Sequence, residues 1–336
     1  MNGLYTLSSS GTTGNPLNVT LDDAAWYAVN YYFFAQIRDH AGLPEDLFQR
    51  GRPAVLFVSN KPGRPSFVRP LPSLNDGLYL RFQLPESADA VLPVLRKFPA
   101  PVLYGKPTYL LELRTALLGL GLARAPWHPR LLLVSGEPLH ADDRRRLTDY
   151  FGAPVIDALA STEGGLIAAT EPDGTTYRVF GENVRLEVLD EQGGTSASGT
   201  GELVLTNLVN HSTAFVRYRT GDRAELATGP DGTQRLTRLW GREPETVRFR
   251  TRELPADEVT RALGFLPGLA DFQLARRPDD GGTLLRWAAE TTYDAPDALA
   301  AALRDALAGL LPDEDVRWER CARITPPGGK KRRFHL

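Results

Sequence analysis

Several residue types that mark particular classes of protein are scarce in this sequence of 336 residues. A single cysteine, Cys321, excludes an internal disulfide and any cysteine-rich metal site. The five histidines are scattered without the spacing of metal ligands. No apolar run approaches the roughly 18 residues that a membrane-spanning helix needs, and residues 1–7 do not form a signal peptide. We therefore expect a cytoplasmic protein without a membrane partner.

A large excess of charge of one sign is absent as well. Lysine and arginine number 39 against 41 aspartates and glutamates, and the formal net charge is −2. A balance so close to zero gives no general attraction to nucleic acid or to an anionic membrane. With 42% hydrophobic residues, the chain is long enough and apolar enough to bury a sizeable core.

What the sequence does contain is a regular alternation of short apolar runs and helical patterns. The pattern predicts, in order, strands at 53–59 and 130–134, an amphipathic helix at 139–151 and a strand at 155–157. This order of strand, helix and strand predicts a parallel sheet. Two further strands, at 184–189 and 201–207, flank a Gly/Ser-rich turn at 192–199 and indicate an added β-rich part.

A compact α+β pattern follows Gly241, where we place a domain boundary. Its expected elements are a strand at 246–250, a helix from about 255, a strand at 282–291 and a helix at 296–310. The sequence thus predicts an α/β protein with two domains. A large N-terminal domain of mixed and parallel sheets with flanking helices spans residues 1–240, and a small C-terminal α+β domain spans residues 241–336.

Four segments carry residues that suit chemistry on phosphates. The first follows an expected strand at 4–7 and is a loop of Ser9, Ser10, Gly11, Thr12, Thr13 and Gly14. Backbone N–H groups and hydroxyls in such a loop can surround phosphate oxygens. It is not the lysine-containing P-loop, since no lysine follows Gly14. Taken alone, the loop also fits a polar turn or a disordered N-terminus.

The second segment, residues 157–165, ends an expected strand, where ligands of open α/β sheets bind. Glu163 beside the Thr162 hydroxyl can hold Mg²⁺ and a phosphate oxygen. The same pair fits the start of a helix, with Thr162 as N-cap and Glu163 favoured by the helix dipole. Upstream, Gly136 and Glu137 end another strand and form either a pocket wall or a simple turn.

The third and fourth segments carry an aspartate and a lysine. Asp222 follows a glycine turn and can accept both hydroxyls of a ribose, or it closes a surface hairpin with cross-strand ion pairs. Lys330 follows two glycines and can reach into a site. A run of four cations is also typical of a solvated tail or a weak nucleic-acid patch. Because the rest of the chain is not basic, we expect no nucleic-acid partner.

Taken in this order, the segments resemble the adenylate-forming superfamily of acyl-CoA synthetases, peptide-synthetase adenylation domains and luciferases. Five segments carry the resemblance, namely the phosphate loop at 9–16, Leu159–Glu163 at the place where the family has Tyr-Gly-x-Thr-Glu, Tyr-Arg-Thr-Gly-Asp at 218–222, the interdomain Gly241-Arg242 and the C-terminal Gly329-Lys330. The resemblance spans the whole chain. The phosphate loop, residues 135–138 and Asp157 look most like the phenylacetate–CoA ligase branch.

The resemblance implies roles for the matched residues. It implies that Ser10, Thr12 and Thr13 hold the β- and γ-phosphates. Thr162 and Glu163 hold the α-phosphate and Mg²⁺, and Lys330 bridges the carboxylate and the α-phosphate during adenylation. The other implied nucleotide-binding residues are Ser9, Gly11, Gly14, Gly136, Glu137, Asp157, Leu159, Ala160, Asp222 for the ribose, and Arg242 for ribose or phosphate.

The departures from the family pattern matter as much. Leu159 replaces the adenine-stacking tyrosine and Ala160 its neighbouring glycine, so we expect adenine to be held by apolar contact. Pro244 replaces the acidic hinge residue, and Thr251 replaces a glycine beside the pantetheine tunnel. Because proline fixes φ and threonine adds bulk, we expect CoA to be a poor acceptor. The chain also begins at the strand before the phosphate loop, so it is either a shortened enzyme or starts further upstream.

We therefore expect an enzyme that uses ATP and Mg²⁺ to adenylate a small carboxylic acid, of the aryl class, with release of pyrophosphate. An amine or thiol acceptor, in solution or on a partner enzyme, then takes the acyl group. The branch resemblance implies secondary metabolism such as antibiotic biosynthesis, with phenazine modification as one example. Aromatic residues within 26–34 either line an acyl pocket or form helix core. An acyl-CoA ligase of the phenylacetate–CoA ligase type and a catalytically silent nucleotide-binding or scaffold protein remain as alternatives.

Overall fold

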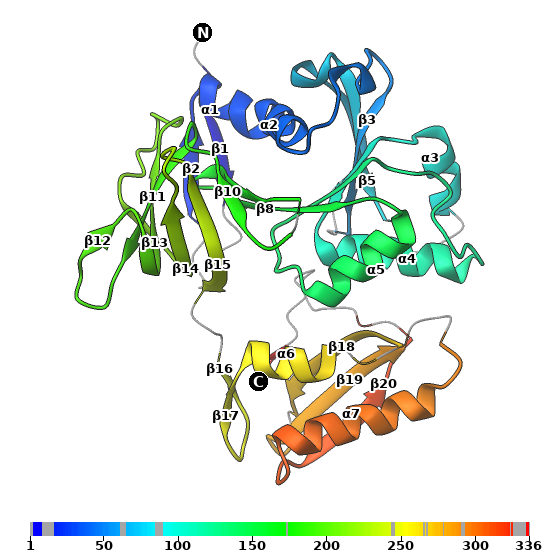
Figure 1. Cartoon of the computed structure of the whole chain (residues 1–336). Coiled ribbons are helices and arrows are strands. Elements are labelled where there is room, and N and C mark those ends of the chain that lie inside the picture. The colour runs from blue at the N-terminus through cyan, green and yellow to red at the C-terminus, as the bar shows by residue number, and fades with distance from the viewer. Residues whose placement is uncertain are drawn as a thin grey trace. The chain divides into compact units, whose positions relative to one another are not determined.

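The computed structural model describes residues 3–8, 17–60, 65–84, 90–172, 174–242, 246–264, 266, 268–277, 279–289, 293–322, 324 and 334–335. The chain divides into two compact units, drawn in Figure 1. The first comprises residues 1–59, 64–114 and 124–243, and the second comprises residues 60–63, 115–123 and 244–336. Among the described helices, none has the length and hydrophobicity needed to cross a lipid bilayer.

A large mixed sheet forms the framework of the first unit. Its strands are β3 (Pro53–Ser59), β4 (Phe67–Leu71), β5 (Gly77–Gln83), β6 (Val102–Gly105), β7 (Leu131–Ser135), β8 (Val155–Ser161), β9 (Gly165–Thr170), β10 (Tyr177–Val179), β11 (Val184–Leu189), β12 (Thr195–Ser196), β13 (Gly199–Asn207), β14 (Tyr218–Thr228) and β15 (Gln234–Arg242). Within the described residues their order is β12-β11-β13-β14-β15-β10-β9-β8-β7-β6-β3-β5-β4.

Pairing within this sheet is parallel from β5 to β8 and antiparallel on both sides of that part, since the edge strand β4 pairs antiparallel with β5. β5, β3, β6, β7 and β8 are joined by parallel pairs. β8 pairs antiparallel with β9, and each strand from β9 to β12 along the sheet order also pairs antiparallel with its neighbour. The predicted mixed and parallel sheet is thus confirmed. The hairpin between β8 and β9 lies where the direction of pairing changes.

Burial along the strands follows this division. β7 is buried over its whole length, as expected of a parallel strand that is covered on both faces. Residues of β7 and β8 pack in one core cluster with Phe33, Phe34 and Ile37. Three helices alternate with these strands along the chain (Figure 1): α3 (Val91–Lys97) precedes β6, α4 (Pro107–Gly119) lies between β6 and β7, and α5 (Ala141–Phe151) lies between β7 and β8. In β14, by contrast, exposed Arg223 and Glu225 alternate with buried residues, which is typical of antiparallel strands with one solvated face.

A nearly continuous helical segment follows a small antiparallel pair, β1 (Tyr5–Ser8) and β2 (Asn18–Leu21). It consists of α1 (Asp23–Tyr27), the π-helical turn η1 (Ala28–Tyr32) and α2 (Phe33–His40). The Asp22 carboxylate caps α1 by accepting a hydrogen bond from the Ala25 N–H at 2.8 Å. This bond holds the pKa of Asp22 below its ordinary value. Two short 3₁₀ turns, η2 (Glu45–Leu47) and η3 (Pro72–Leu74), complete this region.

The aromatic residues of this helical segment do not share one face. Phe33 and Phe34 are buried in the core, with ring centroids 6.0 and 5.9 Å from that of Tyr104. Tyr27 and Tyr32 are each 44% exposed. For the two phenylalanines, the structure therefore supports the helix-core interpretation.

The second unit has its own sheet and core. Its elements are β16 (Thr246–Arg248), β17 (Glu253–Pro255), α6 (Ala256–Gly264), β18 (Leu269–Arg276), β19 (Thr283–Ala289), α7 (Pro296–Leu310), β20 (Val316–Arg320) and β21 (Phe334–His335). The described strands form a sheet in the order β20-β19-β18-β21, and β16 and β17 form a separate pair. Leu299, Leu303 and Leu307 bury one side of α7 in the core, since positions four apart share a helix face.

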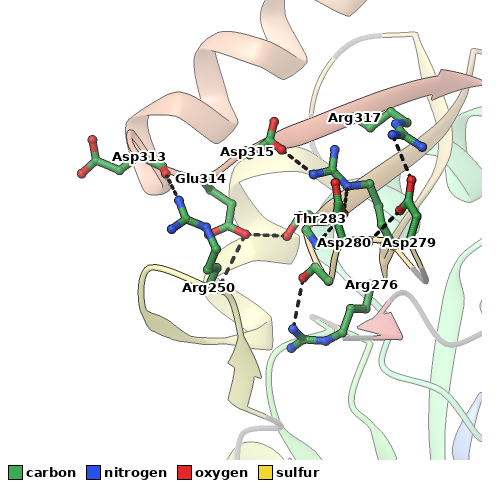
Figure 2. Close-up of polar contacts among 12 residues, drawn as sticks. Arg250, Arg276, Asp279, Asp280, Thr283, Asp313, Glu314, Asp315 and Arg317 are labelled. Carbon is green, nitrogen blue, oxygen red and sulfur yellow. Dashed lines mark hydrogen bonds and ion pairs between the residues drawn. The ribbon is translucent and has the colours of Figure 1, made fainter.

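A polar cluster ties three turns of the second unit together, and we call it the Glu314 network (Figure 2). The Glu314 carboxylate accepts hydrogen bonds from the Thr283 hydroxyl at 2.8 Å and from the Thr251 hydroxyl and N–H at 3.0 and 3.1 Å. Burial alone would raise the pKa of Glu314, but these bonds lower it below its ordinary value. Beside it, the buried Arg277 guanidinium pairs with Asp280 and Asp315. The turn that contains Thr251 is thereby held to the segment after α7.

Several element boundaries differ from the sequence prediction for physical reasons. The strands at 53–59 and 184–189 and the helix at 296–310 are confirmed residue for residue. β8 runs on to Ser161 instead of ending at residue 157, because pairing with β9 prolongs it. The turn expected at 192–199 contains β12, which pairs with the end of β11. The strand expected at 246–250 is shorter, at β16, because a hairpin to β17 follows it. The strand expected at 282–291 is described as β19 over Thr283–Ala289, and residues 290–291 lie outside the described residues.

Candidate active site

Thr162 and Glu163 lie in the tight turn that joins β8 to β9. The Ser161 hydroxyl accepts a hydrogen bond from the Gly164 backbone N–H at 2.9 Å, which closes the turn. Gly165 already pairs with Ser161 across the hairpin, so no helix begins here. The alternative in which Thr162 caps a helix is therefore wrong. Pairing along the whole of β9 outweighs the local capping pattern.

Position 164 is a glycine that lies close to side chains of neighbouring strands. A Cβ atom there would lie 2.7 Å from Leu205 Cδ1 and 2.8 Å from Ile167 Cγ1. Both distances are shorter than real carbon contacts, so a side chain at this position would need the Leu205 and Ile167 side chains or the turn to shift. Gly164 therefore allows close packing of the Thr162–Glu163 turn against these side chains.

Asn207, at the end of β13, holds this turn from the other side. Its Nδ2 donates a hydrogen bond to the Glu163 carbonyl oxygen at 2.7 Å. Its Oδ1 accepts from the backbone N–H groups of Val209 and Asn210, both at 2.8 Å. Since a carbonyl only accepts and an N–H only donates, these partners fix the orientation of the amide. No motif in the sequence identifies Asn207, because its partner lies 44 residues away.

The other predicted residues of β8, Asp157, Leu159 and Ala160, each have different neighbours. Asp157 is buried, and its carboxylate accepts a hydrogen bond from the Tyr177 hydroxyl at 2.6 Å. Burial raises the pKa of Asp157 above its ordinary value, and burial likewise raises the pKa of Tyr177. Leu159 packs against the apolar cluster of the β-rich part. The pairing of β8 with β9 shifts by one residue between Leu159 and Ala160, which is a β-bulge.

Gly136 and Glu137 follow β7, directly beside β8, because Ser135 pairs with Ala158. Gly136 has φ +83°, a left-handed conformation that favours glycine. The Glu137 carboxylate pairs with Lys106 Nζ at 2.9 Å and accepts a hydrogen bond from the Thr108 hydroxyl at 2.7 Å. Sequence reasoning missed Lys106, whose only signal is its position just after β6. Because its side chain is 39% exposed, it places an accessible cation at the carboxyl ends of the strands.

Asp222 lies in the middle part of β14 and is paired in register with Arg242 of β15. Gly221 before it has φ +79°, and its N–H donates to the Glu202 carboxylate at 3.2 Å. Arg219 also pairs with Glu202, so the cross-strand ion pairs expected of a surface hairpin are present. The structure thus brings the two residues assigned to the ribose onto neighbouring strands, within a hairpin that is charged on its exposed face.

Several predicted residues lie outside the described part of the chain, namely Ser9, Ser10, Gly11, Thr12, Thr13, Gly14, Pro244 and Lys330. Within the described residues, no three His, Cys, Asp or Glu side chains gather as a metal site. The half-buried Glu163 carboxylate and the Thr162 hydroxyl nevertheless fit Mg²⁺ that arrives with ATP. Magnesium commonly uses one or two protein carboxylates together with phosphate oxygens and water.

Comparison with solved structures identifies the architecture, although no protein-family model and no curated protein matches the chain. 2-Hydroxyisobutyryl-CoA ligase in its postadenylation state with 2-HIB-AMP is 18% identical, with a TM-score of 0.73, over 98% of this chain and 73% of that one. The anthranilate CoA ligase AuaEII with anthranoyl-AMP is 17% identical, with a TM-score of 0.61, over 98% and 64% of the two chains. ATP-bound MatB from Rhodopseudomonas palustris is 18% identical, with a TM-score of 0.56, over 96% and 65%.

The chain has the adenylate-forming fold. Two of these three structures contain an acyl-adenylate and the third contains ATP. At identities of 17 and 18% the likeness establishes the adenylate-forming fold, and the reaction must be argued from the residues of the chain itself. The phenylacetate–CoA ligase branch stays a prediction that these structures do not test.

Proposed function

We propose that this chain activates a carboxylic acid as its acyl-adenylate, with ATP as co-substrate and pyrophosphate as product. The observation that carries the proposal is the fixed turn of Thr162 and Glu163 on an adenylate-forming fold. The turn lies where the sheet changes from parallel to antiparallel pairing. The turn also follows the carboxyl end of β8, and in open α/β sheets ligands bind outside the carboxyl ends of the strands.

The reaction brings together groups that repel one another. A carboxylate oxygen attacks the α-phosphorus, and the bond from that phosphorus to the bridging oxygen breaks, so that pyrophosphate leaves. Both reactants are anions, so the protein must position them and place positive charge where negative charge develops. Mg²⁺, when bound, neutralises phosphate charge.

The residues of the chain divide this work. Thr162 and Glu163 hold the α-phosphate and the magnesium ion, and Asp222 accepts the ribose hydroxyls beside Arg242. Lys330 supplies the cation at the attacking carboxylate. Lys106, held by Glu137 beside β8, contributes a second accessible cation at the same edge of the sheet. Adenine is held by apolar contact, since Leu159 stands at the position of the stacking tyrosine.

The finer proposal concerns the acid and its acceptor. We propose an aryl acid of secondary metabolism, such as a phenazine carboxylic acid, and an amine or thiol acceptor. The relatives bind acyl groups as unlike as 2-hydroxyisobutyryl and anthranoyl, so the fold by itself does not select the acid. Transfer to CoA is the acceptor reaction named for those ligases. Thr251 argues against it here, because this side chain replaces the glycine that relatives keep beside the pantetheine tunnel.

The test is acid-dependent release of pyrophosphate from ATP across a panel of carboxylic acids. The Glu163→Gln variant should fold normally and lose most of this activity, because a neutral amide is a poor ligand for a hard cation. Wild-type activity in that variant would assign Glu163 a purely structural role. Release of pyrophosphate with none of the acids, together with tight ATP binding, would favour a silent nucleotide-binding protein.

A further inference from the structure

The segment between β13 and β14, residues 207–215, forms a loop that is closed on itself. The Asn207 backbone N–H donates to the Phe215 carbonyl at 2.9 Å, which joins the two ends of the loop. Inside it, Asn207 Oδ1 accepts from the Asn210 N–H at 2.8 Å, and Asn210 Oδ1 accepts from the Ser212 N–H at 3.2 Å. Compact loops whose ends lie close together are often functional.

One side of this loop holds the turn of Thr162 and Glu163. Asn207 Nδ2 donates to the Glu163 carbonyl at 2.7 Å, while Oδ1 of the same amide is bonded within the loop. A single side chain therefore joins the turn to the loop. The part of the site that we assign to the α-phosphate and Mg²⁺ is fixed relative to residues 207–215.

The other side of the loop holds β2. Among the described strands, β1 and β2 form a sheet of two, so β2 has an edge that no third strand covers. The Thr20 N–H donates to Thr213 Oγ1 at 3.0 Å, and the Thr20 carbonyl accepts from Asn210 Nδ2 at 3.0 Å. The His211 N–H adds a bond to the Asp22 carboxylate at 3.2 Å. The loop thus satisfies the backbone groups of β2 that a neighbouring strand would otherwise bind.

β2 is also the strand that follows the predicted phosphate loop. In the pair of β1 and β2, Ser8 lies opposite Asn18, and the Ser8 hydroxyl donates to Asn18 Oδ1 at 2.5 Å. The segment between these two residues contains the predicted phosphate-binding residues 9–14. Both ends of that segment are therefore held at one place, and the bonds from the loop 207–215 to β2 determine where that place lies.

We propose that the loop 207–215 sets the distance between the two phosphate-binding parts of the site, with Thr213 as the positioning residue on the side of β2. The inference rests on the proposed function, because it assigns the β- and γ-phosphates to residues 9–14 and the α-phosphate to Thr162. A triphosphate contacts both parts at once, whereas AMP contacts only the second. The affinity that a triphosphate gains from holding both parts depends on how they are spaced.

The test compares a triphosphate with AMP in the variant Thr213→Val. This change keeps the size and branching of the side chain and removes the oxygen that accepts from the part-buried Thr20 N–H. β2 can then shift to let this N–H reach water, and a triphosphate must bring it back. Affinity for α,β-methylene-ATP, measured by calorimetry with Mg²⁺, should fall about 10-fold, the order of one lost hydrogen bond. Affinity for AMP should not change, and Thr213→Ser should restore the wild-type values.

A kinetic readout and a matched control separate positioning from general stability. In pyrophosphate release, Thr213→Val should raise KM for ATP and leave kcat at saturating ATP nearly unchanged. Thr206 Oγ1 also accepts from a backbone N–H at 3.0 Å, that of Arg217. Thr206→Val therefore removes the same kind of bond without touching β2, and it should keep the wild-type ratio of the two nucleotide affinities.

A measurement on the wild-type protein covers the case in which Thr213→Val folds poorly. Amide hydrogen exchange of residues 17–22, which include Thr20, should be slowed by α,β-methylene-ATP and less by AMP. Slower exchange would mean that the triphosphate stabilises β2 in its place against the loop.

The outcomes distinguish this inference from the proposed function. Acid-dependent pyrophosphate release with an unchanged affinity ratio in Thr213→Val, or with equal protection of residues 17–22 by the two nucleotides, would keep the proposed function and overturn the inference. The same selective loss in Thr206→Val would also overturn the inference. A selective loss in Thr213→Val alone, without pyrophosphate release for any acid, would keep the spacing role and overturn the proposed function. Binding of neither nucleotide by the wild type would overturn both.

Discussion

The hydrogen bond from Asn207 Nδ2 to the Glu163 carbonyl, 2.7 Å long, offers a way to disturb the candidate active site without touching a substrate group. The substitution Asn207→Asp keeps the size and shape of the side chain. It also keeps an oxygen for the N–H groups of Val209 and Asn210, which lie at 2.8 Å. At the other end, an NH₂ donor facing the Glu163 carbonyl becomes an acceptor oxygen, and the side chain gains a negative charge, which the control variant Asn210→Asp gains as well.

The size of the effect follows from that single contact. A part-buried carbonyl loses its partner and faces a second acceptor, and a group left unpaired in this way costs about 1–3 kcal/mol. The turn will relieve the repulsion by moving, and Glu163 moves with it. A displacement of a catalytic group by about 1 Å can cost about 10²-fold in rate. We therefore expect kcat for pyrophosphate release to fall by about 10- to 100-fold.

The assay is acid-dependent pyrophosphate release measured over a range of Mg²⁺ concentrations. KM for ATP should change little, and the Mg²⁺ concentration for half-maximal rate should rise, because the magnesium ligand is displaced. Asn210→Asp is the matched control, since it removes donors to the Thr20 and Thr213 carbonyls instead. It should lower the melting temperature without a comparable fall in kcat. Equal kcat in the two variants would refute the reasoning.

Three further predictions concern other parts of the chain. Lys330→Ala should lower kcat by about 10²-fold with ATP affinity unchanged, whereas Lys331→Ala should be near wild type; the reverse result would move the catalytic lysine by one residue. Burial raises the pKa of Asp157 in the folded protein above its ordinary value of 3.8. The stability that the protonated Asp157 contributes to the folded state is therefore fully present below the pKa of the unfolded state, and it is lost as the pH rises through the pKa of the folded state. Tyr177→Phe removes a hydrogen bond to the charged carboxylate, so its deficit in melting temperature should widen between pH 4 and pH 7; a constant deficit would contradict this assignment. Mass spectrometry should show the adenylate captured faster by hydroxylamine than by CoA, and Thr251→Gly should speed the CoA reaction; rapid saturable thioester formation by the wild type would refute this.

Local sequence patterns were sufficient for much of the fold. The strand at 53–59 is an apolar run, and the helix at 296–310 opens with proline and carries apolar residues on one face. Such elements are specified by residues within a few positions of one another. The mixed sheet and the small second sheet followed from their order along the chain.

The candidate site was harder to predict from the sequence, because contacts between residues far apart in the chain determine its geometry. Thr162 and Glu163 carry the same local pattern as a helix start, and only pairing with β9 makes them a turn. Asn207 shows no signal in the sequence, because its partner lies 44 residues away. Lys106 lacked a motif, and its pairing with Glu137 depends on β6 and β7 being neighbours in the sheet.

The hold of Asn207 on the Glu163 carbonyl also bears on the order in which the chain acquires its final shape. The bond from Gly164 to Ser161 closes over three residues and can form as soon as the hairpin does. The bond from Asn207 joins residues 44 apart and needs β13 in place, a closure with a larger entropic cost. The Thr162–Glu163 turn can therefore form before the bond from Asn207 fixes its position. A chain that has completed β8 and β9 but not β13 carries every residue of the Thr162–Glu163 motif without the geometry to use it.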